Sequence, residues 1–141
     1  MFFGEFEYRI DEKGRMPFPP RFRPAFKEGI VLAQGVEKCI TIYTPAEWKK
    51  LADSINGSSL PASKLRALNR AMFASAYFLS LDAQGRISLP TSLRAYAAIG
   101  EDIIIAGANS YLELWDRATW EAEKKTSQEQ TWQIIESLER R

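Results

Sequence analysis

The chain has 141 residues, of which 45% are hydrophobic and 26% charged, and its formal net charge is +1. This mix is typical of a soluble globular protein and excludes both a disordered chain and a strongly basic surface, so any nucleic-acid contact must be local. Because histidine is absent, cysteine occurs once and no glycine-rich phosphate loop is present, we expect no catalytic residue, no metal ion, no cofactor and no small-molecule substrate.

The first predicted unit opens with a strand at residues 3–10, which runs into a turn with the sequence DEKGR at residues 11–15. Glycine allows a positive φ in such a turn and aspartate accepts backbone N–H groups, so we expect Asp11 and Gly14 to shape it. A short strand follows the turn, and Pro19 then opens a short helix.

A hairpin and a helix complete this unit. Residues 30–33 and 39–43 are apolar runs separated by a loop with a glycine, which predicts two paired strands. Cys39 opens the second run, and free cysteine is usually buried, so we predict a buried strand residue there. The sequence from Thr44 to Glu47 is a capping box with proline at the first helical position, and it predicts the start of a helix.

A linker and a second helix are predicted next. Residues 53–62 are rich in serine, glycine, asparagine and proline, which is typical of a linker. Residues 64–74 then place Leu65, Leu68 and Met72 on one face of a helix.

The pattern of the first unit returns in the second half of the chain. Residues 82–90 align with residues 11–19 at an offset of 71, and residues 112–115 align with residues 40–43 at an offset of 72. We infer an internal duplication. The second unit should therefore contain a strand at 77–81, a turn shaped by Asp82 and Gly85, a helix opened by Pro90, strands at 103–106 and 111–115, and a helix capped by Asp116.

The tail from residue 124 onward is polar until Trp132, Ile135 and Leu138, which form a short apolar stripe at helical spacing. Two interpretations stay open, because the stripe either docks on the chain's own core or contacts a neighbouring subunit. The predicted organisation is a first unit at 1–53, a linker and connecting helix at 54–75, a second unit at 76–123 and a C-terminal helical tail at 124–141.

Basic residues gather around the first turn. From residue 9 to residue 27 there are six basic side chains and only two acidic ones near the turn, Asp11 and Glu12, whereas the second copy has Gln84 in place of Lys13. The planar fork of arginine suits phosphate groups and the guanine edge, and a two-stranded ribbon fits the major groove. An aspartate and an arginine four residues apart also pair to fix a turn, so both roles stay open for Arg15.

The combined pattern resembles the MraZ family of bacterial transcriptional regulators, two-repeat relatives of the AbrB-type swapped-hairpin DNA-binding proteins. The resemblance covers nearly the whole chain. It rests on the opening MFFG, on both turns with their following prolines, and on Phe22-Arg23, Ile42-Tyr43, Glu47-Trp48, Leu93-Arg94 and Glu113-Leu114-Trp115. Pro17 and Phe18 depart from the small or β-branched residues that are usual after the first turn of the family.

The resemblance implies an α+β fold in which two tandem β-α-β repeats form one pseudo-two-fold swapped-hairpin barrel with peripheral helices. It implies a homo-oligomeric ring that binds double-stranded DNA at short G-containing direct repeats upstream of the division and cell-wall gene cluster, usually as a repressor. It assigns DNA contact to Lys13, Arg15 and Arg86, and the basic cluster adds Arg9, Arg21 and Arg23.

The resemblance also implies association with the nucleoid. No apolar run approaches the about 20 residues of a membrane helix, and the N-terminus has no basic start, so we expect a cytoplasmic protein without a membrane partner. The alternative function is a ring-forming structural or protein-interaction scaffold without specific DNA binding.

Overall fold

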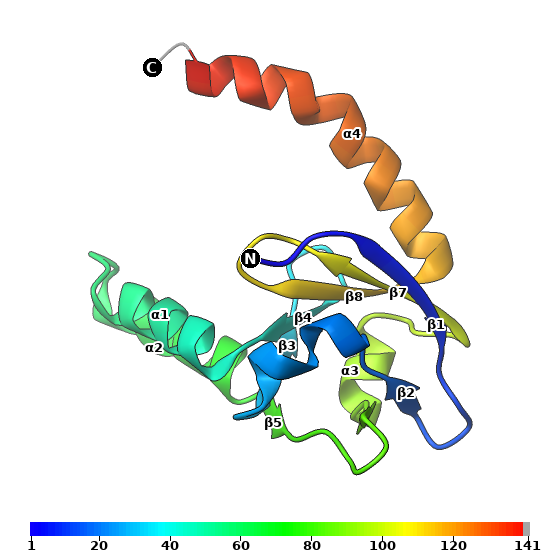
Figure 1. Ribbon diagram of the computed structural model, residues 1–141. Helices are drawn as coiled ribbons and strands as arrows, with labels where there is room; N and C mark the ends of the chain where they lie inside the picture. The colour runs from blue at the N-terminus through cyan, green and yellow to red at the C-terminus, as the bar shows by residue number, and fades with distance from the viewer. Residues whose placement is uncertain (140–141) are drawn as a thin grey trace.

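The structure is a computed structural model that describes residues 1–139, and its fold is α+β, as predicted (Figure 1). Along the chain, each pair of strands is followed by one or two helices. In order they are β1 (Glu5–Arg9), β2 (Arg15–Pro17), the 3-10 helix η1 (Pro20–Phe26), β3 (Ile30–Gln34), β4 (Ile40–Tyr43), α1 (Pro45–Asn56), α2 (Ala62–Phe73), β5 (Tyr77–Leu79), β6 (Arg86–Ser88), α3 (Thr91–Tyr96), β7 (Asp102–Gly107), β8 (Leu112–Asp116) and α4 (Arg117–Glu139).

The two copies pair strand by strand. Apart from the hairpins β3–β4 and β7–β8, every strand pair joins one copy to the other: β1 with β7, β3 with β5, β4 with β8 and β2 with β6. The order of the large sheet is β1-β7-β8-β4-β3-β5. When β1 is exchanged for β5, β3 for β7 and β4 for β8, the same order results, read from the opposite edge of the sheet. Equivalent residues also lie opposite each other, Met16 across from Ile87 and Thr41 across from Glu113. The duplication therefore builds one pseudo-two-fold unit.

No closed barrel is found among the residues that the structure describes. The six-stranded sheet ends at β1 and β5, which do not pair with each other, and β2 and β6 form a separate two-stranded sheet. The reason is that the turns after β1 and β5 carry β2 and β6 out of the large sheet. This short ribbon then buries Met16 and Ile87 as a second layer instead of closing the first.

The main core lies between one face of the large sheet and a layer made of η1, α3 and the β2–β6 ribbon. Side chains alternate between the two faces of a strand, so Ile30 and Leu32 of β3 enter this core while Val31 lies on the opposite face. The opposite face is also buried, because α1 and α2 pack on the half that contains β3, and α4 packs on β7 and β8. Both hairpins are thus buried on both sides.

The helix starts follow the predicted caps. The Thr44 hydroxyl accepts a hydrogen bond from the backbone N–H of Glu47 at 3.2 Å, and the Asp116 carboxylate accepts one from the backbone N–H of Ala118 at 3.3 Å.

The linker predicted at 53–62 begins later than expected, because α1 continues to Asn56 and only residues 57–61 separate α1 from α2. Burial of Ile55 and a 3.0 Å ion pair between Lys49 and Asp53 stabilise this last turn of α1.

The two predicted helical segments after residue 116 form one helix, α4, because no proline or glycine interrupts them. In Figure 1 α4 leaves the body of the protein after its first turns. Trp132 and Leu138 are 74% and 60% exposed, so the stripe does not dock on the chain's own core. Within residues 1–139 no helix has the length and apolarity needed to cross a membrane.

Cys39 is fully buried, as predicted, although it precedes β4 by one residue. Burial, together with the nearby charges of Glu113 and Glu37, raises the pKa of the Cys39 thiol to about 12. The thiol therefore stays protonated at neutral pH and is a poor nucleophile.

Candidate nucleic-acid interface

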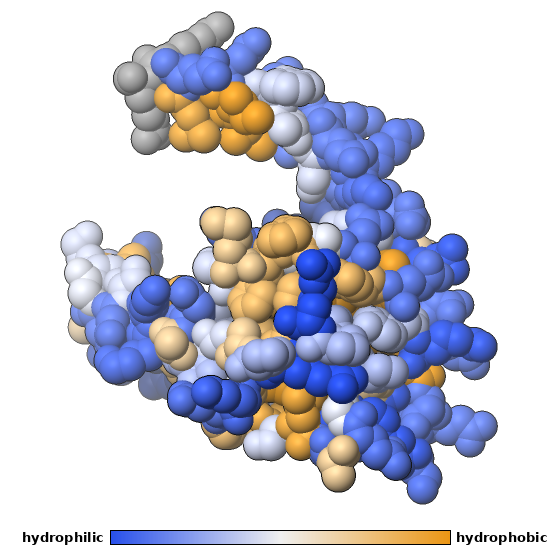
Figure 2. Space-filling model, viewed as in Figure 1, coloured by the Kyte–Doolittle hydropathy of each residue, from blue (hydrophilic) through white to orange (hydrophobic). Residues whose placement is uncertain are grey.

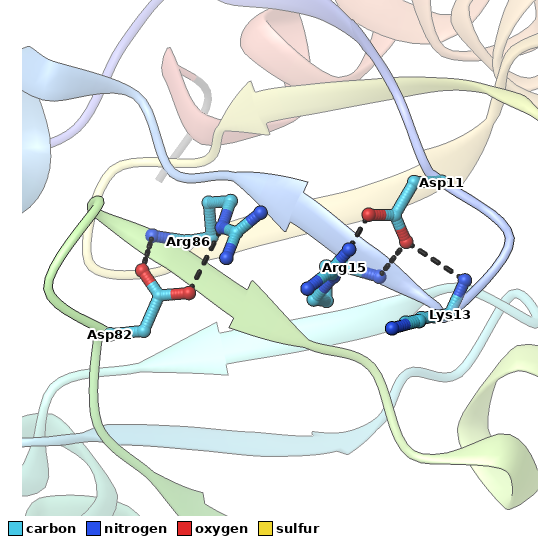
Figure 3. Close-up of polar contacts among 5 residues, drawn as sticks. All are labelled: Asp11, Lys13, Arg15, Asp82 and Arg86. Carbon is cyan, nitrogen blue, oxygen red and sulfur yellow. Dashed lines mark hydrogen bonds and ion pairs between the residues drawn. The ribbon is translucent and has the colours of Figure 1, made fainter.

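The β2–β6 ribbon has one buried face and one exposed face. Met16 and Ile87 point into the core with exposed fractions of 0% and 2%. Their neighbours point the other way, so Arg15 and Arg86 share the outer face. Arg15 lies opposite Ser88, and Arg86 lies opposite Pro17. The two arginines are therefore diagonal neighbours, whose Cα atoms are typically roughly 7 Å apart. Figure 3 shows them on adjacent antiparallel strands.

The first turn is held by Asp11. One carboxylate oxygen accepts the backbone N–H groups of Lys13 and Arg15, each at 2.9 Å, and the other accepts the Nε of Arg15 at 2.9 Å (Figure 3). The N–H of Gly14 donates to the Asp11 carbonyl at 3.0 Å. Gly14 has a φ of +78°, a conformation that is costly for residues with a side chain.

The second turn repeats these contacts. Asp82 accepts the backbone N–H of Gln84 at 2.8 Å and that of Arg86 at 2.9 Å, and its second oxygen accepts the Nε of Arg86 at 2.9 Å. Gly85 has a φ of +75°. Each arginine is therefore fixed by its own aspartate, at equivalent places on the two sides of the pseudo-two-fold axis.

These hydrogen bonds lower the pKa of both aspartates below the ordinary value of 3.8, and the largest cause is the backbone N–H of Arg15 or Arg86. A lowered folded-state pKa stabilises the fold fully above 3.8, and this contribution is lost as the pH falls through the lower folded-state value. We expect carboxyl carbon shifts in NMR to titrate with midpoints below 3.8 for Asp11 and Asp82 in the folded chain, and near the ordinary value in urea. A folded midpoint at or above the urea value would contradict this account of the turns.

The ends of both guanidinium groups stay available. Within residues 1–139 the terminal nitrogens of Arg15 and Arg86 make no hydrogen bond, and these side chains are 33% and 29% exposed. An aspartate that holds Nε leaves both terminal NH2 groups without a partner in the described part of the chain and fixes the plane of the guanidinium. Lys13 lies on the exposed first turn, and Gln84 takes its place on the second.

The other predicted contact residues differ in their surroundings. Arg9 forms ion pairs with Glu101 at 2.8 Å and Asp102 at 3.4 Å, so its charge is compensated. The guanidinium of Arg21 lies over the Phe3 ring at 5.4 Å, in a cation–π contact. Both therefore have partners in the protein that compete with DNA.

Arg23, in contrast, joins the ribbon from η1. Its Nε donates to the Phe18 carbonyl at 3.0 Å, and its guanidinium packs against Gly85 in the turn of the other copy. The structure thus places Arg23 at the second turn, beside the residue that precedes Arg86.

Arg94 was not among the predicted contact residues, yet it lies at the first turn. Its guanidinium carbon is 3.0 Å from the point that a Cβ on Gly14 would occupy. Arg94 is the equivalent of Arg23 at the offset of 71. The sequence shows that Arg94 and Arg23 are equivalent, but it does not show that each packs against the turn of the other copy.

The chain is similar to known proteins along nearly its whole length. The family model described as "MraZ protein, putative antitoxin-like" matches twice, over residues 1–71 and 72–138. The chain is 59% identical over 140 residues to the transcriptional regulator MraZ of Dehalococcoides mccartyi strain BAV1, with 99% of each chain covered. It is 42% identical over 123 residues to the protein of that name from Thermomicrobium roseum, with 87% of each chain covered. The two family matches start 71 residues apart, the offset of the internal duplication.

Proposed function

Since the chain belongs to the MraZ family, we propose that it is a DNA-binding transcriptional regulator that recognises a specific sequence. The observation that carries this proposal is the outer face of the β2–β6 ribbon. Arg15 and Arg86 lie there, and each is fixed through its Nε while its terminal nitrogens make no hydrogen bond within residues 1–139. A protein that only needed to fix its turns would have no use for two exposed guanidinium ends on one face.

The ribbon supplies the geometry for groove binding. A two-stranded ribbon enters the major groove of B-DNA, where a bidentate arginine contacts O6 and N7 of guanine. We assign this contact to Arg15, with Lys13 beside it on a phosphate. Arg86 makes the lesser contact, because Gln84 supplies no charge at the second turn. Short G-containing direct repeats are the targets that fit this arrangement.

A test of this function compares a duplex of G-containing direct repeats with a scrambled duplex of equal length, at two salt concentrations. We expect the repeat duplex to bind more tightly at both, with an affinity that falls steeply as salt rises, because phosphate contacts release counterions. Equal affinity for the two duplexes would remove sequence specificity. No binding to either would favour the scaffold function.

A single unit with few phosphate contacts binds weakly, and we propose that a homo-oligomeric ring overcomes this through effective concentration on repeated sites. Support comes from the far end of α4, where a hydrophobic patch faces solvent (Figure 2). Trp132, Ile134, Ile135 and Leu138 in this segment are 74%, 54%, 37% and 60% exposed. Exposed apolar residues gathered in this way are typical of a subunit contact.

Trp132→Glu is therefore expected to reduce the mass of the assembly measured by light scattering, because it places a charge in the proposed contact. Gln133→Glu is the matched control, since it adds the same charge on the side of α4 that faces away from Ile135 and Leu138 and should leave the mass unchanged. An unchanged mass in Trp132→Glu would exclude this patch from the subunit contact.

We further propose that the regulated genes form the division and cell-wall cluster, that the protein represses them, and that it is cytoplasmic and associated with the nucleoid. The pairing of strands between copies supports a relation to AbrB-type swapped hairpins.

A further inference from the structure

Each turn of the ribbon receives an arginine from the other copy. Arg94 of α3 packs against Gly14 in the first turn, and Arg23 of η1 packs against Gly85 in the second. A Cβ on Gly85 would overlap the Arg23 guanidinium, and a Cβ on Gly14 would lie 3.0 Å from the Arg94 guanidinium carbon, closer than an ordinary contact. The two glycines therefore provide space for an arginine as well as a positive φ.

The two arginines are held differently. Arg23 is anchored by its hydrogen bond to the Phe18 carbonyl at 3.0 Å. Arg94 makes only a long hydrogen bond of 3.3 Å from a terminal nitrogen to the Thr91 hydroxyl, and its buried Nε has no hydrogen-bond partner within residues 1–139. A buried N–H group without a partner is costly, so the free protein leaves the Arg94 guanidinium incompletely satisfied.

The first turn also carries excess positive charge. The three cations Lys13, Arg15 and Arg94 outnumber the two anions Asp11 and Glu12 there. Asp11 is paired with Arg15 at 2.9 Å, and neither Lys13 nor Arg94 has an acidic partner within 4.0 Å among residues 1–139. A net positive charge beside one exposed ribbon attracts an anion, and a guanidinium suits a phosphate oxygen.

We propose that Arg94 contacts a DNA phosphate at the first turn, so that this turn is a composite site of Lys13 and Arg15 from one copy and Arg94 from the other. The proposal rests on the proposed function and adds a residue to it. The unit then has its strongest DNA contact at the first turn, where three basic side chains meet, and a weaker one at the second, where Gln84 takes the place of Lys13.

The test uses the full chain with Arg94→Gln and Arg94→Lys, and with Arg66→Gln on the exposed surface of α2 as the matched control. Affinity for the repeat duplex is measured across a salt series. Loss of one phosphate contact lowers the slope of log affinity against log salt by about 1 for each engaged unit, which is about tenfold in affinity near 0.1 M salt. We expect this change in Arg94→Gln, a largely preserved slope in Arg94→Lys, and no change in Arg66→Gln.

Thermal unfolding of the same variants separates contact from folding. A role confined to supporting the turn would lower the melting temperature of Arg94→Gln and leave the salt slope unchanged, and that result would overturn the proposal. If the wild-type chain binds the repeat and scrambled duplexes equally, the sequence-specific function fails. If the wild type prefers the repeat and Arg94→Gln keeps its slope and affinity, only the role of Arg94 fails.

Discussion

Arg15→Ala is expected to remove specific DNA binding while leaving the assembly and the fold in place. The substitution deletes the fork that contacts guanine, a loss of about 1–3 kcal/mol for each engaged unit, or about fivefold to 150-fold in affinity. Several units acting on repeated sites multiply this loss. Asp11 keeps its backbone hydrogen bonds to Lys13 and residue 15, so the turn persists.

The measurement is a fluorescence-anisotropy titration of the repeat duplex, with light scattering to confirm the size of the assembly. Arg15→Lys keeps the charge without the fork and should lie between wild type and alanine. Arg66→Ala removes an arginine from exposed α2 and should bind as wild type does. Wild-type affinity in Arg15→Ala, accompanied by a lower melting temperature, would show that Arg15 only fixes its turn.

Phe18→Ala is expected to cause the largest loss of stability among single substitutions near the ribbon. Phe18 is fully buried directly after β2, and its ring packs edge-on against Phe26 at 5.0 Å between ring centres. Truncating a buried phenylalanine costs about 3–5 kcal/mol, a large part of the about 5–15 kcal/mol that stabilises a typical domain.

Denaturant unfolding monitored by circular dichroism measures this loss. Phe78→Ala is the control, because Phe78 is 63% exposed and its truncation should cost about 0.5 kcal/mol. A loss below about 1 kcal/mol in Phe18→Ala would mean that the cluster around η1 repacks, and that the ribbon is not supported as the structure indicates.

Local sequence patterns predicted most of the elements. Apolar runs located both hairpins, and the capping box at Thr44 and the N-cap residue Asp116 located the starts of α1 and α4. The repeated turn predicted an internal duplication, and the resemblance to the MraZ family implied the pseudo-two-fold relation between the copies. Phe18, a departure from the family pattern, is explained by the aromatic cluster that it joins with Phe26.

Contacts between distant residues were not predictable in the same way. Nothing near Arg9 in the sequence indicates its ion pair with Glu101, which is 92 residues away. The path of the ribbon depends on where the turns lead the chain. The family resemblance implied a swapped-hairpin barrel, and the described residues form an open sheet with a separate ribbon. Arg94 was missed for the same reason, since its neighbour Gly14 belongs to the other copy.

The central claim is that the outer face of the β2–β6 ribbon recognises repeated DNA sites. Footprinting on the DNA upstream of the protein's own gene tests it most directly, with wild-type protein and Arg15→Ala side by side. We predict regularly spaced protection over short G-containing repeats with the wild type, and its loss with Arg15→Ala at the same concentration. Absence of protection by the wild type, or identical protection by both proteins, would contradict the claim.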